Sequence, residues 1–176
     1  MNEHNIDLKK TNYVIFGVAL LYMAVRLFFI LHPTSTQDEL LNSHVEILVY
    51  LDDLAEVRAF QSVFADAHDR MTLNRDNLDM LLTILVDDLI PASYEMVEIV
   101  ESLTPKTKQL QEIHAILVDA VQLIHQSCLM NYASIIEDDQ EKSRMASEGI
   151  RRATELVHEY NSRLTAYYER QPISSK

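Results

Sequence analysis

The sequence predicts an all-α protein in which an N-terminal transmembrane helix precedes an antiparallel up-down four-helix bundle. Its 176 residues include only two glycines and four prolines, the two residue types that most often interrupt helices. The run from Tyr13 to Leu31 is apolar apart from one arginine. In the rest of the chain apolar residues recur every three or four positions, which is the period of a helix with one buried face. Such segments, joined by short turns, bury their apolar stripes together as a bundle.

The apolar run predicts a membrane signal anchor over residues 12–32, because about 20 apolar residues cross a bilayer as a helix. Two lysines precede the run, and no Lys or Arg follows it until Arg58. The positive-inside rule therefore predicts a cytoplasmic segment 1–11 and an extracytoplasmic bundle over 36–170. A cleaved signal peptide fits less well, because no small-x-small cleavage site follows the run. A buried helix of a soluble protein is the other alternative, and a long stretch without strongly polar residues disfavours it.

Arg26 is the only charge within the apolar run. It lies five residues before Leu31, about 7.5 Å along a helix at ~1.5 Å per residue. A long arginine side chain can reach the lipid headgroups over that distance, so we expect the bilayer to tolerate it. The alternative is that Arg26 pairs with an acidic group in the membrane helix of another protein.

The first predicted helix of the bundle runs from Thr36 to Met71. Thr36 and Glu39 have the spacing of a capping box, which marks a helix start. Its apolar stripe indicates one continuous helix and consists of Leu41, Val45, Leu48, Leu51, Ala55, Phe60, Val63, Phe64 and Ala67. The second segment, 75–103, carries Pro91 in its middle, which predicts either one kinked helix or two short ones.

The third helix is predicted to begin at Thr104-Pro105, a capping hydroxyl followed by proline. Its stripe consists of Leu110, Ile113, Leu117, Val121, Ile124, Cys128, Tyr132 and Ile135. Asp138 or Asp139 can cap the fourth helix, whose stripe consists of Met145, Gly149, Ala153, Leu156, Tyr160, Leu164 and Tyr167. Residues 171–176 are expected to be a disordered tail.

The net charge of −12 argues against nucleic acid as a partner, because phosphate binding needs clustered Lys and Arg. An acidic helical surface in water is the plain interpretation, and a basic partner or a cation site is the alternative. Cys128 is the only cysteine, so neither an intramolecular disulfide nor a multi-cysteine zinc site can form.

Candidate metal ligands are His114, His125, Glu155 and His158. Glu155 and His158 have the Glu-x-x-His spacing that carboxylate-bridged metal sites use in ferritin-like bundles, but no second copy occurs. His114 and His125 lie on or beside the stripe of the third helix, where buried histidines usually bond to a neighbouring helix. We therefore predict no metal site and no cofactor, and keep these four residues as the candidates to examine.

No catalytic motif is found. The chain has no GxSxG, no HExxH and no glycine-rich phosphate loop. The stretch NRDNLD at 74–79 lacks the glycine and the closing glutamate of a calcium loop. An enzyme is therefore not expected, and no catalytic residue is assigned.

The third and fourth helices carry a pattern that resembles a family of small helical proteins of bacterial envelopes. These proteins are mostly uncharacterised, common among Firmicutes and usually lipid-anchored. The pattern is formed by Pro105, Leu110, His114, Leu117, Ala120, Ala146, Ala153 and Leu164, within residues 78–168. The chain departs from the family by having a membrane anchor in place of the lipid-accepting cysteine. The resemblance implies an envelope location and a helical bundle, with no catalytic residues to carry over.

The layout of a membrane helix before a bundle also resembles the extracytoplasmic sensory bundle of chemoreceptors. Chemoreceptors have a second membrane helix after the bundle, whereas no apolar run follows Tyr168 here. Signalling would then have to pass through a partner.

Together these observations predict a membrane-anchored extracytoplasmic bundle with a non-catalytic binding, scaffolding or accessory role. Its expected partners are the lipid bilayer and another membrane or envelope protein. The alternative is a metal- or cofactor-binding bundle of the ferritin-like or sensory kind.

Overall fold

The computed structural model describes residues 42–169, and within this range the chain is all helical, without strands. In order, the elements are α2 (Asn42–Asp53), η1 (Glu56–Arg58), α3 (Ala59–Leu73), α4 (Leu78–Thr83), η2 (Ile84–Leu89), α5 (Ile90–Ser102), α6 (Lys108–Ile136) and α7 (Gln140–Glu169). The all-α prediction is confirmed for these residues. The predicted anchor with Arg26, the cytoplasmic segment, the start of the first helix and the tail lie outside them.

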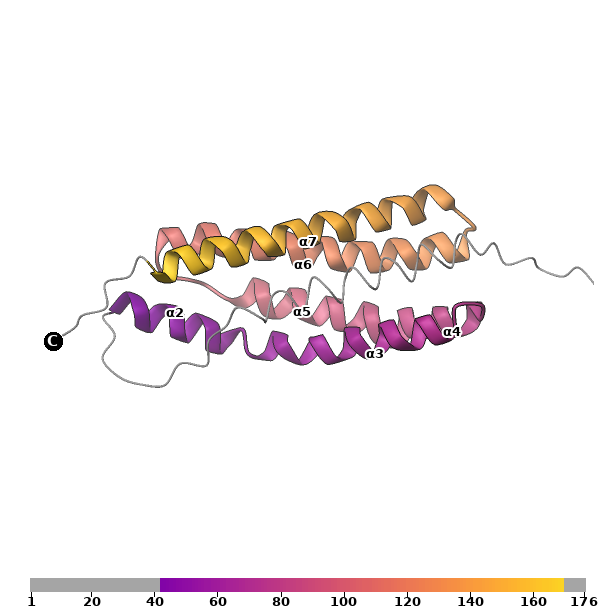
Figure 1. The fold of residues 1–176 in the computed structure, drawn as a ribbon, viewed down its shortest axis with the longest axis horizontal. Helices are drawn as coiled ribbons and strands as arrows, with labels where there is room; N and C mark the ends of the chain where they lie inside the picture. The colour runs from indigo at the N-terminus through magenta and orange to yellow at the C-terminus, as the bar shows by residue number, and fades with distance from the viewer. Residues whose placement is uncertain (1–41, 170–176) are drawn as a thin grey trace, which may run out of the picture.

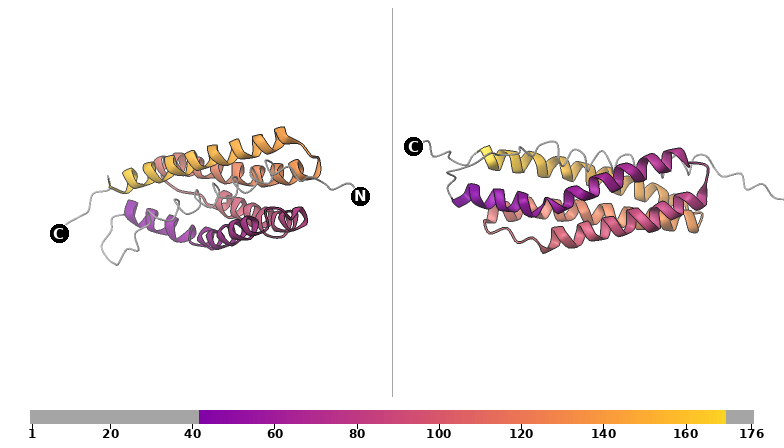
Figure 2. Two further views of the ribbon diagram at one scale, coloured as in Figure 1. Left: turned by 45° about the vertical axis from the view of Figure 1, so that its right-hand side comes forward. Right: turned by 90° about the horizontal axis from the view of Figure 1, so that it is seen from below.

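The helices lie lengthwise beside one another (Figures 1 and 2). α6 and α7 pack together along their whole length, and α5 packs against α6. The chain from α2 through η1 to α3 forms a further rod that contacts η2 and α5. A shared apolar core fills the space between them, and its largest fully buried side chains include Phe64, Leu85, Leu117 and Tyr160.

The predicted continuous helix up to Met71 is wrong in its middle, where a turn and the 3₁₀ helix η1 separate α2 from α3. There the backbone N–H groups of Ala55, Val57 and Arg58 bond to the carbonyl three residues earlier. A 3₁₀ helix has three residues per turn, so Leu54, Val57 and Phe60 are brought onto one side. These three side chains are buried, whereas Ala55, which the stripe was expected to include, is exposed.

Pro91 does not end its helix, because a π-helical turn, η2, comes directly before α5. Proline has no N–H, and in a regular α-helix its ring clashes with the carbonyl four residues earlier. Within the π turn the N–H of Ile90 bonds to the carbonyl of Leu85, five residues earlier. The wider turn accommodates the proline, so α4, η2 and α5 form one continuous rod.

The connection from α5 to α6 corrects the predicted helix start. α6 begins at Lys108 with Thr107 as its cap, three residues after the expected Thr104. The cause is a contact with α2: the carboxylate of Glu46 accepts the backbone N–H groups of Lys106 and Thr107, at 2.6 and 2.8 Å. This contact holds the connection in a non-helical conformation.

α7 begins as predicted, after an aspartate cap. The side chain of Asp139 accepts the N–H groups of Glu141 and Lys142, at 2.9 and 3.1 Å. Asp138 has a φ of 56°, the left-handed conformation that lets the chain reverse between α6 and α7.

One helix among the described residues, α6, is long and apolar enough to cross a membrane. It contacts both α5 and α7 and buries Leu110, Leu117 and Ile124 in the core. A helix between two neighbours needs apolar residues on more than one face, and 44 % of the apolar stretch of α6 is buried in the fold. The predicted anchor is a different segment, outside the described residues.

Candidate functional site

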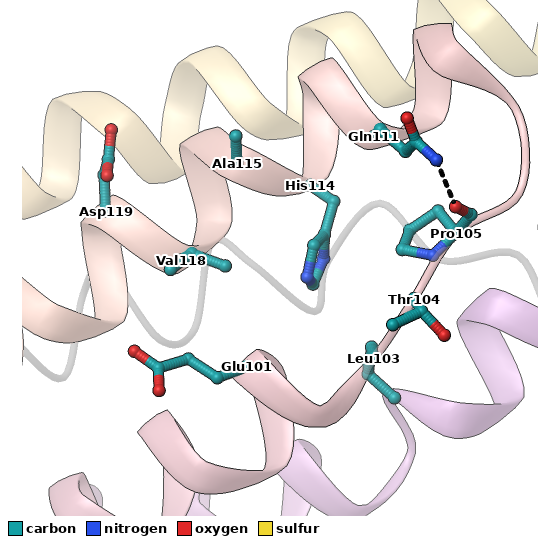
Figure 3. A pocket seen from close by; sticks show the side chains of 9 residues that line it. All are labelled: Glu101, Leu103, Thr104, Pro105, Gln111, His114, Ala115, Val118 and Asp119. Atoms are coloured by element: carbon teal, nitrogen blue, oxygen red, sulfur yellow. Dashed lines mark hydrogen bonds between the residues drawn. The ribbon is translucent and has the colours of Figure 1, made fainter.

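A pocket of about 460 Å³ opens where α5 passes into α6. It is lined by Glu101, Leu103, Thr104, Pro105, Gln111, His114, Ala115, Val118 and Asp119 (Figure 3). Most of the lining surface is apolar. Its volume falls within the range of about 300–1,000 Å³ that is usual for small-molecule sites.

His114 projects from α6 and lies at the centre of this pocket, beside the connection between α5 and α6 (Figure 3). The side chain is 8 % exposed, and both ring nitrogens have partners. One nitrogen bonds to the backbone of Val100, where only the carbonyl is an acceptor for a ring N–H. That nitrogen therefore carries the proton, and the other, Nδ1, accepts from the hydroxyl of Tyr50 at 3.0 Å.

The hydrogen bonds continue through the core. Tyr160 donates its hydroxyl proton to the hydroxyl of Tyr50, at 3.2 Å. The resulting chain runs from Tyr160 in α7 through Tyr50 in α2 and His114 in α6 to Val100 in α5. It therefore links four helices through one buried polar network.

The environment keeps every member of this network neutral near pH 7. Burial lowers the pKa of His114, and the bond to Val100 opposes that effect only in part. Burial raises the pKa of Tyr50 and of Tyr160 above the usual value for tyrosine. His114 is thus a neutral hydrogen-bonded wall of the pocket.

Two carboxylates, Glu101 and Asp119, lie at the end of the pocket away from Pro105 (Figure 3). Glu101 accepts the side-chain amide of Gln122 at 2.6 Å. At the opposite end the amide of Gln111 donates to the carbonyl of Pro105 at 2.9 Å. The mouth of the pocket is acidic at one end, while the imidazole N–H and one of the two amide N–H groups of Gln111 are bonded to carbonyls.

His125 belongs to a second buried polar group. Its Nδ1 lies 3.0 Å from the hydroxyl of Ser93, which itself donates to the carbonyl of Ile90 at 2.9 Å. Cys128 contacts the same hydroxyl, and burial raises the pKa of its thiol to about 12. A thiol with so high a pKa is not a nucleophile near neutral pH, so this group is structural.

Glu155 and His158 are exposed on the outer face of α7. Glu155 is paired with Arg151 and Arg152. The four candidate metal ligands are therefore not brought together, and no group of three or more His, Cys, Asp or Glu side chains suited to a metal ion occurs within residues 42–169.

Sequence reasoning identified His114 but missed its partners, Tyr50 and Tyr160, and the two pocket carboxylates. A tyrosine on a core stripe was an available signal, because a buried hydroxyl needs a hydrogen-bond partner. Tyr160 was on the predicted stripe of its helix, and His114 was on the stripe of the preceding one.

Comparison with protein-family models, curated proteins and solved structures finds no match to this chain. The resemblance to envelope bundle proteins therefore stays a prediction.

Proposed function

We propose that the protein is a single-pass membrane protein that presents an antiparallel four-helix bundle outside the cytoplasmic membrane and uses it for non-catalytic binding. The observation that carries this proposal is the pocket beside His114. It is open, largely apolar and acidic at one end, and its imidazole is held by bonds on both sides. Such a wall can hold a ligand in place, whereas a general acid or base must be able to exchange a proton with its substrate.

The bundle part of the proposal is supported by the contacts between successive rods. The rod formed by α2, η1 and α3 packs on the rod formed by α4, η2 and α5. This second rod packs on α6, and α6 packs on α7. Short connections between neighbours in sequence are the pattern of an up-down bundle.

The membrane part rests on the sequence, through the apolar run from Tyr13 to Leu31 and the lysines before it. The envelope location rests on the same run and on the resemblance described above. A lipid bilayer and another envelope or membrane protein are the partners that this placement implies.

The proposal is tested with a C-terminally tagged full chain in intact cells. Externally added protease should digest the bundle, and carbonate washing should leave the N-terminal fragment in the membrane pellet. Protection from protease together with release into the wash would overturn the proposed placement. Protection of the bundle together with its retention in the pellet would show the opposite orientation, with the bundle on the cytoplasmic side of the membrane.

A further inference from the structure

We propose that the pocket beside His114 binds a small organic cation, an alkylammonium ion whose hydrocarbon body lies on the apolar wall and whose charge lies at the acidic end. This inference rests on the proposed binding function and names its ligand class. Three features of the pocket favour this ligand: its apolar wall, its two carboxylates and the absence of Lys and Arg from its lining.

The apolar wall selects the body of the ligand. Leu103 and Pro105 from the connection, with Ala115 and Val118 from α6, supply apolar lining on both sides of His114. Removing apolar area from water contributes about 25 cal/mol per Å², so a short alkyl chain gains affinity here. A strongly polar molecule such as a sugar would find few hydrogen-bonding groups on this wall.

The carboxylates select the charge. Neither Glu101 nor Asp119 forms an ion pair with a Lys, Arg or His side chain within residues 42–169. Arg152 borders a neighbouring hollow beside Asp119, but it is bound to Glu155. The acidic end of the pocket therefore has uncompensated negative charge.

An anionic ligand is disfavoured for a complementary reason. An anion needs a cation or several free N–H donors, and the residues that line the pocket include no Lys or Arg. The imidazole N–H of His114 is bonded to Val100, and one of the two amide N–H groups of Gln111 is bonded to Pro105. The charge of the first half of the described chain also disfavours an anion. Residues 42–102 hold three arginines, no lysine and 13 Asp or Glu, a net charge of −10. A field of that sign concentrates cations near the surface.

The size of the pocket favours a free small molecule over a protein partner. A stable protein interface buries about 800 Å² on each side, far more than this nine-residue hollow offers. A lysine side chain of a partner has the same chemistry, so the experiment distinguishes the two sources.

The test measures binding of pentylammonium to the purified full chain in non-ionic detergent, by ligand-observed saturation-transfer NMR. Glu101→Gln and Asp119→Asn each remove one charge, and an exposed ionic contact contributes about 0.2–1 kcal/mol, so we expect up to about fivefold weaker binding for each. The double variant should bind about tenfold more weakly. Glu98→Gln is the matched control, because it removes an exposed carboxylate from the same helix outside the pocket.

Pentan-1-ol at the same concentrations controls for the alkyl chain, and far-UV circular dichroism checks that each variant is folded. Equal binding of the alcohol, or equal weakening by Glu98→Gln, would overturn the proposal. Binding of a lysine-containing peptide without binding of pentylammonium would also overturn it, in favour of a protein partner. The protease and carbonate experiment fails or succeeds independently, so a wrong ligand class and a wrong membrane placement give different results.

Discussion

The two halves of the described chain, residues 42–102 and 103–169, differ in the regularity of their helices and in their net charge. The first half has a net charge of −10 and reaches its length through a 3₁₀ turn and a π turn. The second half has seven Lys or Arg against ten Asp or Glu, a net of −3, and forms two uninterrupted helices of 29 and 30 residues. The second half is regular and nearly balanced, whereas the first is irregular and carries most of the negative charge.

Local ion pairs account for part of this difference. On α7, Arg144, Arg151, Arg152 and Arg163 pair with glutamates three or four positions away along the helix. In the first half the bond from Arg70 to Asp88 joins two rods, at 2.6 Å. The second half thus pairs its arginines within one helix, whereas the first half has three arginines for 13 Asp or Glu and leaves acidic side chains available to a ligand or partner.

The largest effect is expected from breaking the close approach of α6 and α7. A Cβ atom on Gly149 would lie 2.3 Å from the hydroxyl oxygen of Ser127, so Gly149→Leu should push the helices apart and destabilise the fold by about 2–3 kcal/mol. Urea unfolding followed by far-UV circular dichroism measures the change. As the control, adding Gly149→Ala to Ser127→Ala should stabilise that variant by up to about 1 kcal/mol, because the clash is gone and alanine favours helix. An unchanged unfolding midpoint for Gly149→Leu would contradict the close contact.

A smaller loss is expected from breaking the network that joins the two halves. Tyr50→Phe removes the hydroxyl that donates to His114 and accepts from Tyr160, so it should cost about 1–2 kcal/mol of unfolding free energy. Tyr94→Phe is the matched control, because its hydroxyl bonds to Glu98 on the exposed surface and its loss should matter less. Equal effects of the two substitutions would show that the buried network does not stabilise the fold.

Two histidines, His114 in this network and His125 beside Ser93, should make stability depend on pH. Burial lowers the pKa of His114 and of His125 in the folded chain, so the unfolded chain binds more protons as the pH falls below about 6.5. The contribution of these histidines to the free energy of unfolding should therefore be constant above about pH 6.5. It should decrease as the pH falls toward their pKa values in the folded chain, and it should not change further below those values. Urea unfolding between pH 7.5 and pH 5 measures the slope. His114→Gln should flatten it, and an unaltered slope in this variant would contradict the assignment.

The smallest effect is expected from the bridge between rods in the acidic half. Arg70 and Asp88 are both partly exposed, so Arg70→Gln should destabilise by only about 0.5 kcal/mol after allowance for screening by solvent. Thermal unfolding at low and high salt checks this, since the difference from wild type should shrink as salt is added. A difference that is independent of salt would indicate lost packing of the arginine stem.

The regular half is also the half that could be predicted well from the sequence. The stripe from Leu110 to Cys128 is buried as expected, because a long helix repeats its period without interruption. On α7 the stripe is correct from Ala153 onward. Before it, Ala146 and Ile150 are buried, Met145 is exposed, and Gly149 is half-buried against Ser127.

Contacts between the two halves account for departures that spacing could not predict. The contact of Glu46 with the N–H groups of Lys106 and Thr107 moves a helix start, and it joins residues about 60 positions apart. Spacing in the sequence carries no information on such a contact. The same holds for the buried hydrogen-bond network, since Tyr50 and His114 are 64 residues apart and only the packed helices bring them together.

The π turn before Pro91 also determines which side chains of α5 face the core. A π turn contains one residue more than an α turn, and one residue corresponds to about 100° of rotation. A chain lacking that residue would turn Tyr94 and Glu101 toward the places now held by Ser93 and Val100. Both are exposed side chains, so two polar groups would be driven into the core. The inserted residue thus keeps the carboxylate of Glu101 at the rim of the pocket and the carbonyl of Val100 against His114.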